Sequence, residues 1–206
     1  MNVFVLTTGR SGSAAFINAC KFISNYTSGH ESNSRILTAE KFKYSTNHIE
    51  ADNRLIWFLG SLDKAFGNEA LYVNLVRNKK ETVNSLKKRI LSNTSIIRSF
   101  ASGILKTPYQ TLDDTEIDQV TNLYYDTVYD NIALFLKDKD NCITVHLESI
   151  NEDFKKFWDE INAEGDLQAA LNSFDSPVNA TKKQLNLGYK LKSFVQQQLF
   201  HLKKLK

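Results

Sequence analysis

The stretch FVLTTGRSGSAAF, residues 4–16, constrains the fold of this chain more than any other segment. An apolar strand, Val3–Leu6, is expected to run into a turn that contains Gly9 and Gly12, and a helix-compatible pattern begins at Ser13. This order gathers backbone N–H groups and the positive end of a helix dipole around one point, which suits an anion. The segment therefore predicts a phosphate-binding loop at the end of a buried strand.

This loop differs from the loops that bind nucleoside triphosphates. Those loops read GxxxxGK[ST], in which the lysine contacts the β- and γ-phosphates and the hydroxyl holds magnesium. Here Arg10 lies inside the turn, and serine rather than lysine follows Gly12. A P-loop kinase of a small metabolite is one hypothesis for such a chain, but the expected lysine is missing.

Short apolar runs alternate with helical periodicity along the chain, and this alternation predicts the fold class. We expect an α/β protein with a three-layer, P-loop-like fold, in which helices flank a central parallel β-sheet. Because loops at the carboxyl ends of parallel strands carry function, we expect an acceptor pocket in the irregular stretches 24–50, 94–115 and 174–184. The expected strands are Val3–Leu6, Leu71–Val76 and Ile143–Leu147, and the expected helices are 13–23, 55–66, 117–136, 154–161 and 187–205.

Composition limits the class of protein. A length of 206 residues with 42% hydrophobic content suits one core, so we expect residues 1–206 to form a single domain. A net charge of only +3 argues against wholesale nucleic-acid binding.

The sequence also bears on where the protein is found. No run approaches the roughly 20 apolar residues of a membrane span, and a strand that begins near residue 2 leaves no room for a signal peptide, so we expect a cytoplasmic protein. Cys20 and Cys142 lack metal-ligand spacing and are expected to be buried, reduced thiols.

A second candidate phosphate site follows the strand Leu71–Val76, where the sequence reads RNKKETVNSLKKR. Arg77 stands at the strand end, and Ser85 follows eight residues later inside an expected helix. A guanidinium can bind a phosphate through two parallel hydrogen bonds, and a hydroxyl can add a third. Taken alone, each residue has an ordinary alternative, because Arg77 could pair with a surface carboxylate and Ser85 could be a neutral helix residue.

Together these motifs resemble those of the sulfotransferases that use 3′-phosphoadenosine 5′-phosphosulfate (PAPS). TTGRSGS looks like their 5′-phosphosulfate loop, LVRNKKETVNS is similar to their 3′-phosphate motif, and ITVHLESI resembles a later strand that carries Tyr-Glu. The resemblance covers residues 2–92 and 142–162, and it is to short bacterial-type sulfotransferases. It implies these donor-binding residues: Thr8, Gly9, Arg10, Ser11, Gly12 and Ser13 for the phosphosulfate, Arg77 and Ser85 for the 3′-phosphate, and Lys182 or Lys183 from a later loop.

The same resemblance implies a general base in the segment TSGHES. In tyrosylprotein and several bacterial sulfotransferases the base is a glutamate downstream of the loop arginine, and here Glu31 lies 21 residues after Arg10. His30 is the alternative, since cytosolic small-molecule sulfotransferases use a histidine. By pattern alone, both could instead be surface residues of a polar loop.

The resemblance implies an enzyme that transfers a sulfuryl group from PAPS to a hydroxyl of a saccharide or small metabolite. A sulfuryl group carries less negative charge than a phosphoryl group, so charge neutralisation by a metal is less necessary than in kinases, and no metal is expected. A non-catalytic nucleotide-binding protein with the same fold is the remaining alternative.

The chain departs from the family pattern at Leu147, where the family has tyrosine, so a contact of that residue with adenine is absent or replaced. Glu148 either braces the nucleotide loop or caps the helix that is expected near Asn151.

Further candidates for the acceptor side lie in HIEADN. His48, Glu50 and Asn53 could face the acceptor, whereas Glu50 and Asp52 would equally suit the first turn of a helix.

Overall fold

The computed structural model describes residues 1–92 and 94–175. The chain groups into two compact units, of which the first contains residues 1–79 and the described chain from Thr127 onward, and the second contains residues 80–126. The expectation of a single domain over residues 1–206 stays a prediction.

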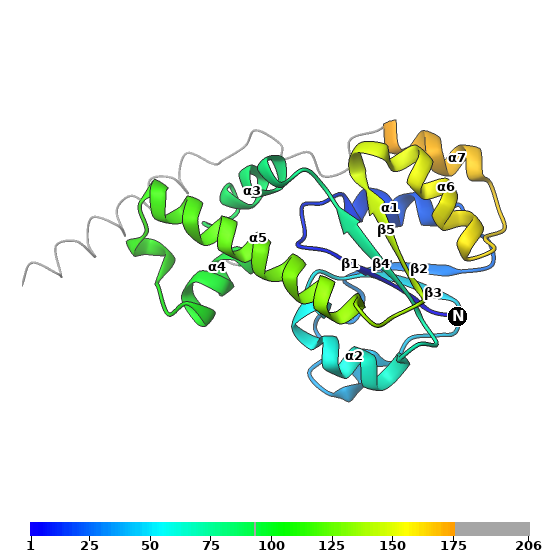
Figure 1. The fold of residues 1–206 in the computed structure, drawn as a ribbon, viewed down its shortest axis with the longest axis horizontal. Coiled ribbons are helices and arrows are strands. Elements are labelled where there is room, and N and C mark those ends of the chain that lie inside the picture. Colours follow the sequence, from blue (N-terminus) through cyan, green and yellow to red (C-terminus); the bar gives the residue numbers. More distant parts are fainter. Residues whose placement is uncertain (93, 176–206) are drawn as a thin grey trace, which may run out of the picture. The chain divides into compact units, whose positions relative to one another are not determined.

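The first unit is built on a five-stranded sheet with the strand order β2-β3-β1-β4-β5 (Figure 1). All neighbouring strands are parallel, so Val3 of the central strand pairs with Ile49 on one side and Leu71 on the other. The predicted α/β fold with a central parallel sheet is confirmed. The strands are β1 (Val3–Leu6), β2 (Thr27–His30), β3 (His48–Ala51), β4 (Leu71–Val76) and β5 (Cys142–His146).

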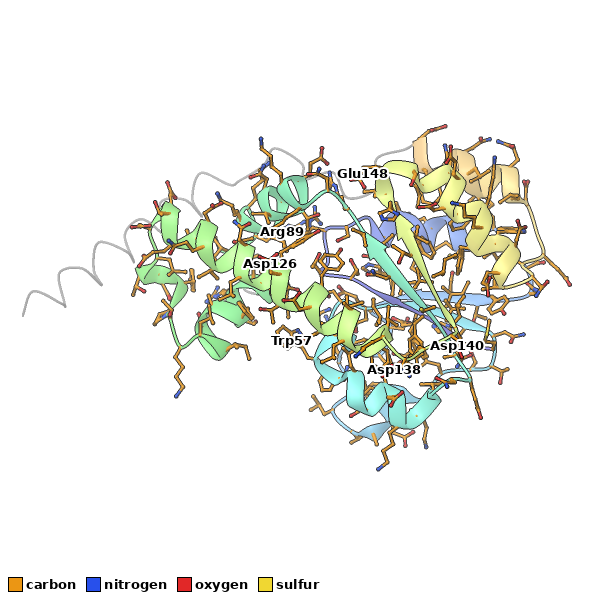
Figure 2. The ribbon with its side chains drawn as sticks, viewed as in Figure 1. Trp57, Arg89, Asp126, Asp138, Asp140 and Glu148 are labelled. Carbon is orange, nitrogen blue, oxygen red and sulfur yellow. The ribbon has the colours of Figure 1, made fainter. Side chains whose placement is uncertain are left out.

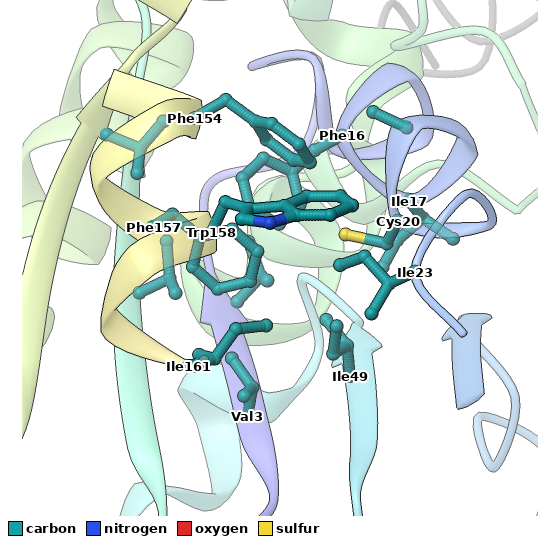
Figure 3. Close-up of a cluster of buried hydrophobic side chains, with 14 of the residues drawn as sticks. Val3, Phe16, Ile17, Cys20, Ile23, Ile49, Phe154, Phe157, Trp158 and Ile161 are labelled. Carbon is teal, nitrogen blue, oxygen red and sulfur yellow. The ribbon is translucent and has the colours of Figure 1, made fainter. Parts of the chain in front are cut away.

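One face of the sheet is covered by α1 (Ser13–Cys20) and α6 (Ile150–Glu160). Val3 and Val5 belong to a buried cluster with Phe16 of α1 and with Phe157 and Trp158 of α6 (Figure 3). The helix α7 (Leu167–Asn172) adds Ala170 and Leu171 to the same cluster. Burial of these large side chains is the main source of stability in this layer.

The opposite face carries an aromatic layer, because alternate side chains of a strand point to opposite sides. The ring of Phe4 lies 4.6 Å from that of Phe66, the last residue of α2 (Leu59–Phe66), and 6.2 Å from that of Tyr72. Tyr72 in turn contacts Phe135 edge to face at 5.0 Å. Because other apolar side chains cover both faces of the sheet, all four residues of β1 are buried, as expected for a central parallel strand.

The second unit is helical. Its elements are most of α3 (Lys79–Lys87), α4 (Ile96–Ser99), a π-helical turn (Phe100–Ile104), a 3₁₀ turn (Tyr109–Thr111) and the beginning of α5 (Asp114–Leu136). The start of α5 is a reciprocal cap, in which the backbone N–H of Glu116 donates to Asp113 at 2.8 Å and that of Asp113 donates to Glu116 at 2.9 Å. Phe100 packs on Tyr124 with their rings 5.3 Å apart.

The structure corrects several expectations. The stretch 24–50 is not wholly irregular, because it contains β2 and β3. Glu50 therefore lies in a strand and not in the first turn of a helix. Both strands are only four residues long and mix polar with apolar residues. Hydrogen bonding to neighbouring strands, rather than a hydrophobic pattern in the sequence, therefore determines them.

Smaller differences concern element ends and one thiol. The first helix ends at Cys20, and β5 lies one residue earlier than expected. Cys20 is buried as expected, but Cys142 is exposed, because it begins an edge strand. The expected helix at 187–205 lies outside the described residues.

Candidate functional site

The carboxyl ends of the five parallel strands lie along one edge of the sheet, and most of the predicted site residues follow these ends. Thr7 to Gly12 follow β1, Glu31 follows β2, Asp52 and Asn53 follow β3, Arg77 follows β4, and Leu147 and Glu148 follow β5.

The loop after β1 has the backbone of an anion-binding turn. Gly9, Arg10 and Gly12 have φ angles of 75°, 61° and 91°, and such left-handed residues turn successive N–H groups toward a common point. Gly12 is the N-cap of α1, no side chain caps this helix end, and no acidic residue lies in its first turn. The N–H groups that begin α1 thus present a positive dipole end with no acidic residue in its own first turn, which fits a phosphate or sulfate group.

Two loop hydroxyls face inward. Thr8 and Ser11 are fully buried, and their hydroxyl oxygens lie 2.9 Å apart. Thr8 also donates to the carbonyl of Gly9 at 2.9 Å. These contacts brace the turn, and contact of either hydroxyl with a donor molecule stays a prediction.

Neighbouring loops close over both glycines. A Cβ atom on Gly12 would lie 2.7 Å from the Cδ1 atom of Leu147, and one on Gly9 would lie 2.9 Å from the side-chain nitrogen of Asn53. Leu147, which replaces the tyrosine of the family pattern, therefore packs on the loop. Asn53, a candidate for the acceptor side, lies against the loop as well.

The structure brings the two predicted phosphate motifs together through Arg77. Its Nη1 atom donates to the carbonyl of Arg10 at 3.2 Å. The next residue, Asn78, donates its backbone N–H to Oε1 of Glu148 at 2.7 Å, and Glu148 lies just beyond the carboxyl end of β5 (Figure 2). Glu148 therefore braces the segment that follows β4, and its bracing of a nucleotide loop stays a prediction.

The remaining predicted donor ligands are not tested in the same way. Ser85 is partly buried within α3 and belongs to the second unit, and its pairing with Arg77 stays a prediction. Lys182 and Lys183 lie outside the described residues.

The two candidate bases lie side by side in the chain but have different partners. His30 ends β2, and its Nε2 atom lies 3.1 Å from the hydroxyl of Ser13 in the loop region. The Glu31 carboxylate lies 2.9 Å from Nη1 of Arg54, and its side chain is 36% exposed. Glu31 also has a φ of 57°, a strained conformation of the kind that concentrates at functional sites.

Arg54 contacts a second carboxylate, that of Asp52, at 3.3 Å. Asp52 is only 2% exposed, and burial raises its pKa, while the backbone N–H and the guanidinium of Arg54 oppose that rise. Arg54 is thus shared between Asp52 and Glu31.

A buried network behind Glu31 was not predicted from the sequence. Glu50 is fully buried, accepts the backbone N–H of Ser32 at 2.8 Å and lies 3.0 Å from Nε2 of His48. Thr27 lies 2.8 Å from the other ring nitrogen of His48. His48 and Glu50 therefore hold the segment that carries Glu31, and a contact of either with an acceptor stays a prediction. The signal that could have found them is the i, i+2 spacing of a histidine and a glutamate in a short strand.

Within residues 1–92 and 94–175, no cluster of three or more His, Cys, Asp and Glu side chains could hold a metal ion. No helix in the same part of the chain is both long and apolar enough to cross a membrane.

Comparison with known proteins bears on the fold. No family model and no curated protein matches the sequence significantly. Among solved structures, the crystal structure of mouse sulfotransferase SULT7A1 complexed with PAP is similar to this chain, with a TM-score of 0.53 and 13% sequence identity over 91% of this chain and 74% of that one. The chain therefore has a sulfotransferase-like fold.

Proposed function

We propose that this protein is a sulfotransferase that transfers a sulfuryl group from PAPS to a hydroxyl of a saccharide or small metabolite. The observation that carries the proposal is the 3.2 Å hydrogen bond from Arg77 to the carbonyl of Arg10. It joins the two motifs that resemble the phosphate sites of this family, at the carboxyl edge of the sheet. The similar mouse protein is described as complexed with PAP, which further supports an adenosine bisphosphate as ligand.

Each motif would bind one end of the donor. The N–H groups of Ser11, Gly12 and Ser13, together with Arg10, would hold the 5′-phosphosulfate and stabilise negative charge on the departing phosphate. Arg77 would bind the 3′-phosphate, because a guanidinium offers two parallel donors to phosphate oxygens. A nucleotide without a 3′-phosphate lacks this second contact and should bind more weakly.

The chemical step requires a base. Glu31 would take the proton of the acceptor hydroxyl as its oxygen forms a bond to sulfur, and the bond from sulfur to the bridging phosphate oxygen would break with its electron pair leaving on that oxygen. His30 is the alternative base, and its contact with Ser13 places it near the loop. Because a sulfuryl group carries less charge than a phosphoryl group, the loop N–H groups and arginines suffice without a metal.

The first experiment measures ligand binding by calorimetry and thermal shift. The ligands are 3′-phosphoadenosine 5′-phosphate (PAP), AMP, and ATP with magnesium. A ligand at one hundred times its Kd adds about 2.7 kcal/mol to stability, so specific binding of PAP gives a clear shift. We expect PAP to bind more tightly than AMP.

A matched pair of variants tests the site. Arg77→Ala removes charge-assisted hydrogen bonds and should raise the Kd of PAP roughly 10- to 100-fold. Lys137→Ala removes one exposed positive charge from the connection into the amino end of β5, at the opposite edge of the sheet, and should leave the Kd unchanged. Stabilisation by ATP and magnesium alone, with no response to PAP, would refute the proposal.

A further inference from the structure

Tyr129 reaches the candidate site from α5, in the part of that helix that belongs to the first unit. Its hydroxyl donates to the carbonyl of Leu75 at 3.0 Å. The ladder between β1 and β4 ends where Leu6 pairs with Asn74, so β1 has already turned into the loop at this level. Tyr129 thus supplies a hydrogen bond to β4 just beyond the point where β1 leaves it.

The same hydroxyl faces the buried side of the loop. Burial raises the pKa of Tyr129, and hydrogen bonding to Ser11 and Thr8 opposes that rise. Both residues are fully buried and contact each other, and both lie within hydrogen-bonding distance of the carbonyl of Gly9. Because the Tyr129 hydrogen is used on Leu75 and the Thr8 hydrogen on Gly9, the Tyr129 oxygen acts as the acceptor for the hydroxyl of Ser11.

We propose that Tyr129 is a positioning residue, which ties the phosphate-binding loop to the end of β4 and so sets the loop geometry that the donor requires. The proposal rests on the proposed function for the identity of the ligand, but not for the contact itself. Without the phenolic oxygen, the buried hydroxyl of Ser11, which contacts that of Thr8, loses its acceptor, and other turn geometries compete with the one observed.

The test compares Tyr129→Phe with Tyr72→Phe. Tyr72 is a fully buried tyrosine of the same unit whose hydroxyl also donates to a backbone carbonyl, that of Gly67 at 2.9 Å, in the connection that enters β4 rather than at the loop. Both variants keep the ring and lose a hydrogen bond to a backbone carbonyl, and Tyr129→Phe also loses the contact with the loop. Both should therefore lower thermal stability, while only Tyr129→Phe should affect the loop.

Two readouts separate positioning from general stability. In the ligand-free protein, we expect amide hydrogen exchange at residues 7–13 to be about tenfold faster in Tyr129→Phe and unchanged in Tyr72→Phe, since one buried hydrogen bond is lost from the loop. We expect the Kd of PAP to rise several-fold to about tenfold in Tyr129→Phe only. In turnover, the KM for the donor should rise while the KM for the acceptor stays the same.

The outcomes are distinguishable. If amide hydrogen exchange at residues 7–13 is equally fast in the two variants, Tyr129 does not position the loop, whether or not the Kd of PAP changes. Failure of the wild-type protein to bind PAP would reject the proposed function, and the exchange measurement would still decide the role of Tyr129. If Tyr129→Phe does not fold, Ser11→Ala tests the same contact from the loop side, and unchanged exchange at Thr8 and Gly9 in that variant would count against the proposal.

Discussion

The Nε2 atom of His30 lies 3.1 Å from the hydroxyl of Ser13, so the last residue of β2 contacts the first residue of α1. The neighbouring residue Glu31 has another partner, because its carboxylate pairs with Arg54 at 2.9 Å. His30 thus contacts the first residue of α1, whereas the Glu31 carboxylate lies beside the guanidinium of Arg54, which Asp52 also contacts. The two candidate bases can therefore be separated by substitution.

We predict that Glu31→Gln lowers turnover by roughly 10²- to 10⁴-fold, the usual contribution of a general base. The Kd of PAP should stay within about twofold, because the Glu31 carboxylate pairs with Arg54, which is not one of the predicted donor-binding residues, so donor binding is unaffected. The measurement is the rate of PAP formation from PAPS with an acceptor found by screening. Glu40→Gln, a change at an exposed glutamate of the 3₁₀ turn Ala39–Phe42, is the control and should leave the rate unchanged.

His30→Gln gives the complementary result. If Glu31 is the base, His30→Gln should change turnover by less than tenfold, through its contact with Ser13. A large loss in His30→Gln with full activity in Glu31→Gln would assign the base to His30 instead.

Gly12→Ala should damage the loop for two separable reasons. Gly12 has a φ of 91°, which L-residues rarely adopt, and the new Cβ would lie 2.7 Å from Cδ1 of Leu147. We expect a loss of about 1–3 kcal/mol of stability and a loss of PAP binding. In the double variant with Leu147→Ala the contact is relieved but the backbone strain stays, so chemical denaturation should show partial recovery only. Full recovery would show that the contact alone requires glycine.

Glu148→Ala should weaken PAP binding because the backbone N–H of Asn78 loses its acceptor at 2.7 Å. The expected increase in Kd is about fivefold, the effect of one lost hydrogen bond to a charged group in an exposed place. Glu148→Gln keeps an acceptor oxygen and should lie between wild type and the alanine variant. Glu152→Ala, at an exposed position of α6, serves as the control.

The turn between β1 and α1 could be predicted from the sequence because its determinants are local. Gly9, Arg10 and Gly12 follow an apolar strand and precede a helix, and that order alone turns N–H groups toward one point. The bounds of β1 and β4 were predicted correctly for a similar reason: β1 is wholly buried and β4 mostly buried, so each is an apolar run that can be recognised without knowledge of its neighbours.

The parts that could not be predicted depend on residues far apart in the chain. Glu50 is a buried carboxylate only because β2 lies beside β3, where Ser32 and His48 contact it. Gly29 shows the same dependence, since a Cβ there would lie 2.7 Å from Oε2 of Glu50. Tyr129 lies 54 residues from its partner Leu75 in the sequence. The hydrophobic periodicity of its helix does not distinguish a tyrosine that only packs in the core from one whose hydroxyl bonds to a loop.

The cluster of Figure 3 predicts where the first unit is most sensitive to truncation. Phe157 is fully buried and lies 4.9 Å from the ring of Phe16, so Phe157→Ala should lower the free energy of unfolding by about 3–5 kcal/mol. Leu134→Ala, at a side chain that is 73% exposed, should change it by less than about 0.5 kcal/mol. Urea denaturation measures both, and a small effect at Phe157 would mean that the sheet and α6 are not packed as described.

Asp153 should make stability depend on pH on the acid side. It is 6% exposed and accepts hydrogen bonds from the backbone N–H of His146 at 3.0 Å, the hydroxyl of Ser149 at 2.9 Å and the ammonium of Lys156 at 3.0 Å. The hydrogen bond from the His146 backbone is the largest of the causes that hold the pKa of Asp153 well below its ordinary value. The native state therefore binds fewer protons than the unfolded state in the acid range.

The stabilisation by Asp153 is thus complete above its ordinary pKa of about 3.9 and is lost as the pH falls below that value. We expect Asp153→Asn to cost about 1–2 kcal/mol at pH 7 and progressively less as the pH is lowered toward about 2. The urea midpoint measured from neutral to acid pH should converge for wild type and variant, while Asp159→Asn, at an exposed position of α6, should follow the wild type throughout. A difference between wild type and Asp153→Asn that stays constant with pH would show that the carboxylate charge is not what these donors stabilise.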